Sequence, residues 1–209
     1  MISFSWIVLS LVLIANILGV AMLLPQCLRL RHSSELAGVS LEWIGFGVGI
    51  NVAWLLYAFA ERLPGLIPVS AGALVLYCWM LRSVRRVETT AFRRAIGPAM
   101  VVALALLISV VVGGLALFGA SLGIFYTVQF APAAWQSVRQ TDLAGLAPST
   151  WLMALLEAAI WAFYGFVATD IALIIGGLGA LSMSLVVFTN IRSASTHTIA
   201  RRPLAVLRR

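Results

Sequence analysis

One carboxyl group stands near the middle of a long apolar stretch of this sequence. Glu157 lies inside residues 150–168, where its neighbours are almost all apolar. An unpaired carboxylate in hydrocarbon costs several kcal/mol, and ionisable groups at such positions mark binding sites or proton pathways. Glu157 is therefore a candidate for binding a cationic or hydroxylated solute, or for carrying a proton. The competing interpretation is a neutral Glu whose hydrogen bonds only hold packed helices together.

Two tryptophans form the second group of candidate binding residues. Trp54 lies deep within the apolar run 41–60, and Trp161 holds the matching place in a later run. This is deeper than the interfacial belt in which membrane tryptophans gather. An indole offers an apolar face and one N–H donor, which suits stacking on a sugar ring or packing against an aliphatic solute. Asn51 precedes Trp54 by one turn, as Glu157 precedes Trp161. The alternative is that both indoles only fill the core.

Chemistry that needs a metal ion or a nucleophile finds little support in this sequence. The chain has two cysteines, Cys27 and Cys78, and two histidines, which do not make a convincing four-ligand zinc site. No grouping of Ser, His and an acid suggests a nucleophilic enzyme. We therefore expect neither catalytic residues nor a bound cofactor. Two other acids, Glu42 and Asp170, stand at the ends of apolar runs, where water can reach them.

The elements that must position these residues are membrane spans. Hydrophobic residues make up 62% of the chain and charged residues 10%, whereas about a quarter of an average soluble domain is charged. A helix needs about 20 mostly apolar residues to cross a bilayer. Such windows lie near 4–26, 41–60, 63–81, 150–168 and 170–189, and a longer one covers 96–135. We expect an all-α integral membrane protein whose first window is a span rather than a signal peptide.

The basic residues indicate how the chain crosses the membrane. All fourteen are arginines. If the region 96–135 forms two helices with a turn near 113–114 or 119–123, thirteen arginines fall on one side of the membrane and only Arg62 on the other. The positive-inside rule then predicts seven spans, with the N-terminus outside and the C-terminus in the cytoplasm. We expect the plasma membrane as the location. Arginines scattered over such loops favour contact with anionic lipid rather than with nucleic acid.

The sequence also contains an internal repeat with a fixed offset of 107 residues. The aligned identities include Pro25 with Pro132, Leu36 with Leu143, Trp54 with Trp161, Tyr57 with Tyr164, Gly72 with Gly179 and Arg85 with Arg192. Matches at one offset across loops and spans indicate a tandem duplication of a three-helix unit. Two such units can lie parallel only if one more helix joins them, so we expect two parallel three-helix bundles and a linker helix, a 3+1+3 plan. The predicted parts are a first bundle at 1–90, a linker span at 91–114, a second bundle at 115–194 and a basic cytoplasmic tail at 195–209.

The proline, the basic loop and the aromatic spacing together resemble a known repeat. Pro25-Gln26, the loop that ends in Leu36-Ala37-Gly38-Val39-Ser40, and the spacing from Trp54 to Tyr57 look like a PQ-loop repeat. The 3+1+3 plan is similar to that of the SWEET sugar transporters, whose half-length bacterial relatives are the SemiSWEETs. The resemblance covers about residues 4–87 and 111–194. It indicates the fold more specifically than the solute, because the PQ-loop superfamily also includes amino-acid exporters of the cystinosin type and sorting receptors.

Prolines are the candidate hinges. A proline inside a membrane helix leaves a carbonyl without its donor and bends the helix, so Pro25 and Pro132 predict a bend at the same depth in each repeat. The resemblance implies that such prolines act as swivels when the two bundles rock. Neither Pro148 nor Gln26 has an identical residue opposite it under the offset, and Gln26 is expected to cap freed carbonyls.

The same resemblance implies a pocket. It places the tryptophan of each repeat, here Trp54 and Trp161, in the sugar pocket. The family pattern also has an Asn in the third helix of each repeat, and those places hold Ser70 and Gly177 here. The loss of two amides that would bind sugar hydroxyls suggests a different ligand space. Three residues after the tryptophans, at the expected outer gate, are Tyr57 and Tyr164.

These features lead to three functional hypotheses. The first is a SWEET-like facilitative transporter that moves a small polar solute, foremost a sugar, by alternating access. The second is a proton-coupled transporter of amino acids or cationic metabolites that uses Glu157. The third is a membrane receptor or scaffold that carries no flux. The partners expected are the solute and the lipid bilayer, and a homo-oligomer is compatible with all three.

Overall fold

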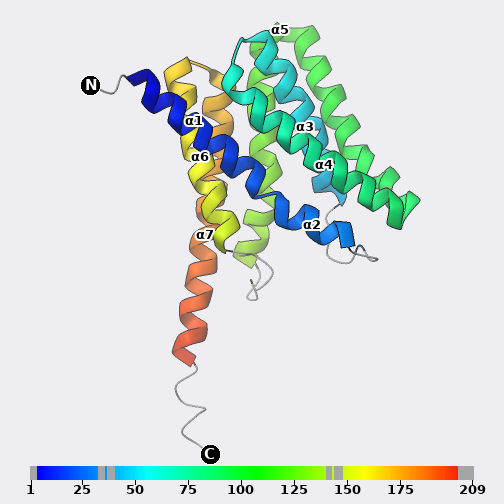
Figure 1. Cartoon of the computed structure of the whole chain (residues 1–209), viewed down its shortest axis with the longest axis vertical. Coiled ribbons are helices and arrows are strands. Elements are labelled where there is room, and N and C mark those ends of the chain that lie inside the picture. The colour runs from blue at the N-terminus through cyan, green and yellow to red at the C-terminus, as the bar shows by residue number, and fades with distance from the viewer. Residues whose placement is uncertain (1–3, 33–35, 37–40, 140–142, 144–147, 202–209) are drawn as a thin grey trace, which may run out of the picture.

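The computed structural model describes residues 4–32, 36, 41–139, 143 and 148–201 (Figure 1). The elements are α1 (Phe4–Ala21), α2 (Leu24–His32), α3 (Leu41–Ala60), the short 3-10 helix η1 (Pro64–Leu66), α4 (Ile67–Val87), α5 (Thr89–Arg139), α6 (Pro148–Ala168) and α7 (Ile171–Arg201). No strand occurs in the residues described. Six helical segments are long and apolar enough to cross a membrane. The all-helical prediction is confirmed, and these six segments are compatible with a multi-pass membrane protein.

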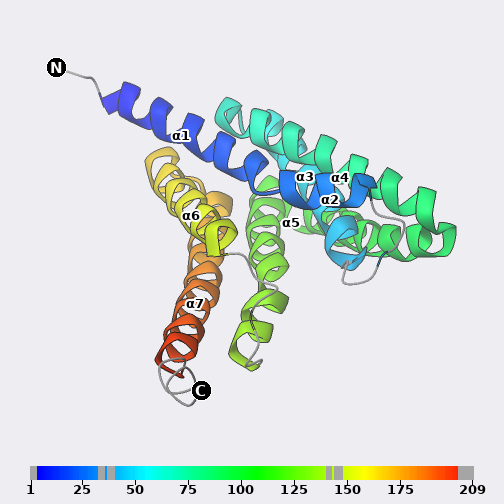
Figure 2. The same ribbon diagram turned by 60° about the horizontal axis from the view of Figure 1, so that its bottom comes forward.

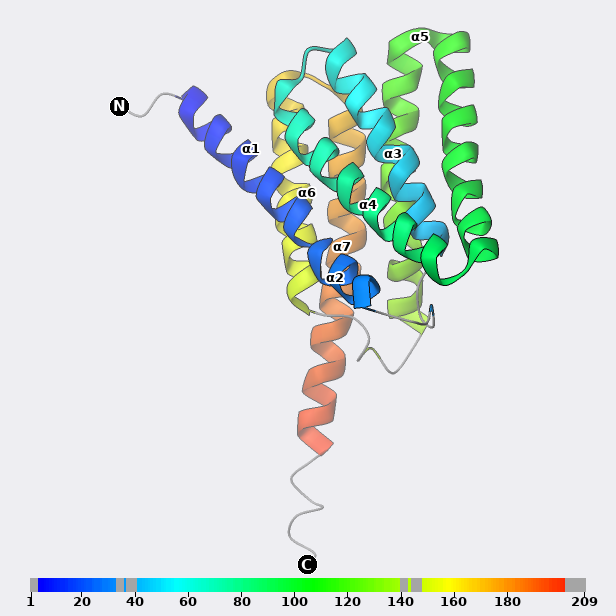
Figure 3. The ribbon, with the colours of Figure 1, turned by 45° about the vertical axis from the view of Figure 1, so that its right-hand side comes forward.

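The long helix α5 reverses its direction at Gly114. This residue has φ 63° and ψ −157°, the one pair of non-helical angles inside α5. Figure 3 shows the two limbs of α5, residues 89–113 and 115–139, lying side by side and running in opposite directions. The turn falls at the first of the two places that the arginine distribution predicted. Its backbone angles belong to a region that is essentially restricted to glycine.

Replacing Gly114 with alanine is expected to lower the free energy of unfolding by about 1–3 kcal/mol, because a side chain strains this backbone conformation. An added Cβ at Gly114 would meet nothing within 4 Å, so backbone strain rather than a clash causes the loss. Thermal unfolding in detergent measures it. The matched control is Gly97→Ala, whose Cβ also meets nothing within 4 Å but whose backbone is helical. An equal loss in both variants would contradict the role of strain at Gly114.

Each half of the chain places its last helix in a central position. In the first half α4 packs against α1, α2 and α3, and in the second half α7 packs against both α5 and α6. Viewed from below, α6 and α7 lie on one side and α3 and α4 on the other (Figure 2). Equivalent contacts recur in the two halves. A side chain added at Gly72 would meet Val20, and one added at Gly179 would meet Thr127, which is 107 residues after Val20.

The buried core differs between the two ends of the molecule. We call the end with Gly114 and η1 the Gly114 end, and the opposite end, with α2, the α2 end. Near the Gly114 end a single cluster joins both halves and includes Trp54, Trp161 and Leu173. Toward the α2 end the halves have separate clusters, one around Met80 and Val84 and one around Val187 and Ile191. The two halves are therefore joined near one end and packed separately near the other.

The two repeat prolines lie in different helical contexts. The chain leaves the helix after Ala21 and begins α2 at Leu24, so the break precedes Pro25, which sits in the first turn of α2. A proline fits there because its missing N–H needs no partner in the first turn. Pro132 lies inside helical α5. The helix is thus interrupted just before the proline of one repeat and continues through the proline of the other, and bends at the same depth stay a prediction.

Two predicted segments fall largely outside the described residues. Residues 37–40 of the PQ-loop resemblance and residues 202–209 of the basic tail are among them. The preceding part of the tail is helical, since α7 continues to Arg201, beyond the predicted boundary at residue 194.

Candidate functional site

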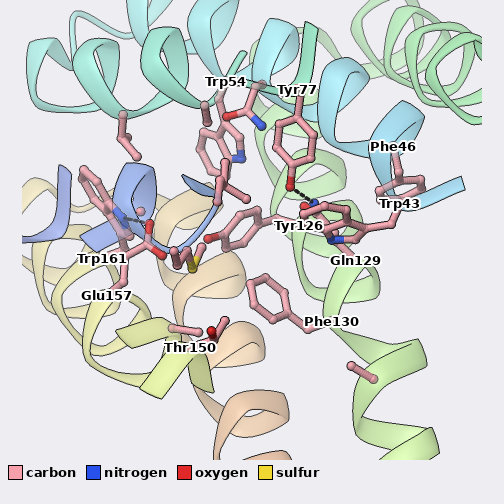
Figure 4. A pocket seen from close by; sticks show the side chains of 18 of the residues that line it. Trp43, Phe46, Trp54, Tyr77, Tyr126, Gln129, Phe130, Thr150, Glu157 and Trp161 are labelled. Carbon is pink, nitrogen blue, oxygen red and sulfur yellow. Dashed lines mark hydrogen bonds between the residues drawn. The ribbon is translucent and has the colours of Figure 1, made fainter. Parts of the chain in front are cut away.

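A cavity of about 730 Å³ lies between the two halves. Its volume falls within the range of about 300–1,000 Å³ that is usual for small-molecule sites. It extends from Leu66 at the Gly114 end, past Trp54 and Trp161, toward Gln136 and Thr150 near the α2 end. Figure 4 shows aromatic and polar side chains from both halves converging on it.

Every residue predicted to bind a solute lines this one cavity. They are Asn51, Trp54, Ser70, Glu157, Trp161 and Gly177. They come from α3, α4, α6 and α7, and the repeat brings them to one place although they are spread over more than half of the chain. The structure thus gathers the predicted residues, while their role in binding stays a prediction.

The two repeat tryptophans have different partners. Trp161 donates its Nε1–H to Oε1 of Glu157, one turn earlier in α6, at 3.1 Å. Trp54 instead packs edge-on against Tyr126 from the second limb of α5, with ring centroids 6.0 Å apart. Both indoles are buried. The two positions hold the same residue, but Trp161 has a polar partner and Trp54 has an aromatic one.

The third-helix positions of the family pattern are occupied in two different ways. Ser70 is buried at the cavity wall. At Gly177 an added Cβ would lie 2.5 Å from the backbone nitrogen of Ala162, because α6 and α7 touch there. An Asn at that position would not fit between the helices. Asn51, considered as compensation, donates its amide Nδ2–H to the Gly47 carbonyl at 2.8 Å within its own helix.

The predicted hinge and gate residues separate into two groups. Pro25, Gln26 and Pro132 line the cavity, whereas Pro148, Tyr57 and Tyr164 do not. Pro148 is exposed and begins α6, where a proline is favourable. The aromatic pairs Trp54–Tyr57 and Trp161–Tyr164 have nearly the same centroid separation, 5.9 and 6.0 Å.

A hydrogen bond crosses between the halves at the Gly114 end. Tyr57 in α3 donates its hydroxyl to Oδ2 of Asp170 at 2.8 Å. The other carboxylate oxygen, Oδ1, accepts the backbone N–H of Leu173 at 2.9 Å and so caps the start of α7. Asp170 is only 9% exposed. The expectation that water reaches Asp170 is therefore wrong, because Tyr57 and the first turn of α7 surround its carboxylate.

Part of the cavity wall was not predicted from the sequence. Tyr77, Tyr126, Gln129 and Phe130 also line it, and Gln129 donates its amide Nε2–H to the Tyr77 hydroxyl at 3.0 Å. A signal was present for one of these residues. Gln129 shares a helical face with residues 133 and 136, at spacings of four and seven residues, and all three line the cavity.

Comparison with known proteins assigns no family to this geometry. No protein-family model matches the chain, and no curated protein matches it. The resemblance to PQ-loop repeats rests on sequence motifs alone, namely Pro25-Gln26, the loop ending at residues 36–40 and the Trp54 to Tyr57 spacing.

Candidate ligands for metal ions are sparse in the described residues. They contain no group of three or more His, Cys, Asp or Glu side chains that could hold a metal ion. Cys27 is buried and Cys78 exposed, and neither forms a disulfide. The cavity wall offers aromatic faces, amides, hydroxyls and carboxyl groups.

Proposed function

We propose that this protein is a SWEET-like membrane transporter that moves a small polar solute by facilitated diffusion and alternating access. The observation that carries the proposal is the cavity between the two halves, together with the way the halves pack. They share one core cluster near the Gly114 end and have separate clusters toward the α2 end. Rocking about the shared region would open and close the cavity. The resemblance makes a sugar the first solute to test.

The proposed architecture is a 3+1+3 arrangement of seven spans. It is supported by the turn at Gly114, which gives α5 two limbs, and by contacts that recur at an offset of 107 residues. In this proposal the first limb of α5 is the linker span and the second limb is the first helix of the second bundle. The central positions of α4 and α7 are equivalent under the same repeat.

We place the α2 end in the cytoplasm and the protein in the plasma membrane. Arginines flank the helix ends at that side, in α2, around the α4–α5 turn and at the end of α5. Arg62, at the Gly114 end, is the exception. The positive-inside rule orients such an arrangement with the arginine-rich end inside. In this orientation the Tyr57–Asp170 hydrogen bond lies on the outer side of the cavity.

Alternating access is tested by linking the outer ends of the two halves. With Tyr57→Cys and Asp170→Cys in a Cys78→Ser background, a short bifunctional thiol reagent should reduce solute flux in proteoliposomes by about tenfold or more, because a linked outer end cannot open. Reducing a cleavable linker should restore the flux. Each single cysteine variant, treated identically, controls for modification alone. Unchanged flux after complete linking would contradict alternating access, and no flux of any solute by the intact protein would favour a receptor or scaffold.

A second candidate function is proton-coupled transport of an amino acid or cationic metabolite. It is favoured by one observation, the Glu157 carboxyl group at the cavity wall. It predicts accumulation driven by a pH gradient, and a Glu157→Gln variant that exchanges solute but no longer concentrates it. Equilibration that ignores the gradient would contradict it and leave the facilitator.

A further inference from the structure

The cavity wall carries acidic groups and no basic ones. Its charged residues are Glu42 and Glu157, and no Arg or His is found among the described residues that line it. The chain contains no lysine, because all fourteen of its Lys and Arg residues are arginines. A cavity that is lined by carboxylates and has low-dielectric walls attracts positively charged solutes.

Glu157 is buried in this wall and is not an exposed surface acid. Glu157 is only 3% exposed. Figure 4 shows its carboxyl group beside Trp161 at the cavity. The Trp161 N–H occupies one site on Oε1, whereas an ionised carboxylate accepts about four hydrogen bonds. Acceptor capacity therefore remains for a donor that enters the cavity.

Gly19 of α1 provides the space that this carboxyl group occupies. A Cβ added at Gly19 would overlap Oε1 of Glu157 and would lie 2.7 Å from Cγ2 of Val69. The equivalent positions of the other repeat do not hold this pair of residues. Tyr126 stands where the second repeat matches Gly19, and Ile50 stands where the first repeat matches Glu157.

The two sides of the cavity are thus unlike although the fold repeats. One side has a glycine and a carboxyl group, and the other has the tyrosine ring of Tyr126 packed against Trp54. The aromatic wall also includes Phe130 and Trp43. A site with carboxylates and several aromatic faces recognises an organic cation, because a carboxylate accepts hydrogen bonds from its N–H groups and the ring faces attract its charge.

We propose that the solute is a small organic cation with a protonated amine, oriented with this group at Glu157 and its remaining part against Trp54 and Tyr126. The proposal rests on the transport function proposed above and names the class of its solute. A bare metal ion fits less well, because no group of three or more candidate ligands exists in the described part of the chain.

The test uses two sets of chemically related probes that differ in net charge. The first set is glucosamine, glucose and glucuronate, and the second is lysine, norleucine and glutamate. Binding to purified protein in detergent is followed by calorimetry and by the shift in unfolding temperature, and flux is measured separately in proteoliposomes, both at pH 6.5. We expect at least one cationic member to bind about tenfold or more tightly than its matched neutral or zwitterionic member. Glu157→Gln should remove this preference, and Glu157→Asp should retain part of it.

Glu61→Gln is the matched control, since Glu61 is an exposed carboxylate that does not line the cavity. It should keep the preference of the unmodified protein. Failure of both cationic probes to bind, equal binding of cationic and neutral probes, or a preference unchanged in a folded Glu157→Gln variant would each overturn the inference. Failure of the transport proposal is distinguishable, because the cations would then bind with the expected preference but show no flux.

Discussion

Replacing Trp161 with alanine is expected to lower solute flux in proteoliposomes by about tenfold or more, a change that corresponds to about 1.4 kcal/mol. The indole is buried at the cavity wall. Its removal takes away an apolar face, and contacts with such a face stabilise a complex more than the buried area alone predicts. It also removes the N–H that holds Oε1 of Glu157. Both effects act on the bound solute, so the loss should appear as weaker binding as well as slower flux.

The contribution of the N–H can be separated from that of the ring. Trp161→Phe retains an aromatic face but frees Glu157, whereas Trp54→Phe removes an N–H from the aromatic side of the cavity. We expect Trp161→Phe to change the preference among solutes of different charge more than Trp54→Phe does. Binding of matched charged and neutral solutes measures this difference.

Trp135→Ala is the control for loss of a tryptophan elsewhere. Trp135 is 63% exposed, does not line the cavity and stacks on Arg139, with 4.1 Å from the guanidinium carbon to the ring centroid. Its loss should leave flux nearly unchanged. Unaltered flux in well-folded Trp54→Ala and Trp161→Ala variants would contradict a pocket and favour tryptophans that only fill the core.

The helices and the turn could be predicted because their causes are local or compositional. Apolar length fixes where spans lie, and the distribution of arginines required a turn in the region 96–135. The structure places that turn at Gly114. The repeat likewise indicated which residues share a site, since Trp54 and Trp161 hold equivalent places in two similar units.

The contacts between halves could not be predicted from local patterns. Asp170 appears in the sequence as an acid at a span end, and its partner Tyr57 is 113 residues away. Gly177 appears as a missing Asn, although close approach of α6 explains it. The helix breaks before Pro25 but continues through Pro132, although both positions hold a proline. Each of these features depends on which neighbour the fold supplies.

The Tyr57–Asp170 hydrogen bond leads to the second large effect. Tyr57→Phe is expected to shift the equilibrium toward an open Gly114 end by about 1–3 kcal/mol, or about fivefold to 150-fold. The reason is that the Tyr57 hydroxyl donates a buried hydrogen bond to a carboxylate, and in the proposed rocking motion opening of that end would break this bond. The measurement is the rate at which a membrane-impermeant thiol reagent, applied at the Gly114 end, modifies a cysteine placed at Asn51 in a Cys78→Ser background. The rate should rise by the same factor.

Substitutions at Asp170 test whether the bond or the start of α7 is responsible. Asp170→Asn keeps a side-chain acceptor for the Leu173 N–H and weakens only the bond to Tyr57, whereas Asp170→Ala removes both interactions. We therefore expect the labelling rate to rise in both variants, with an additional loss of thermal stability only in Asp170→Ala. Tyr164→Phe removes the equivalent hydroxyl of the other repeat and leaves the Tyr57–Asp170 bond intact, so labelling should stay slow. Slow labelling in Tyr57→Phe and Asp170→Asn alike would mean that the shared apolar core around Phe118 and Leu173 closes the Gly114 end without this bond.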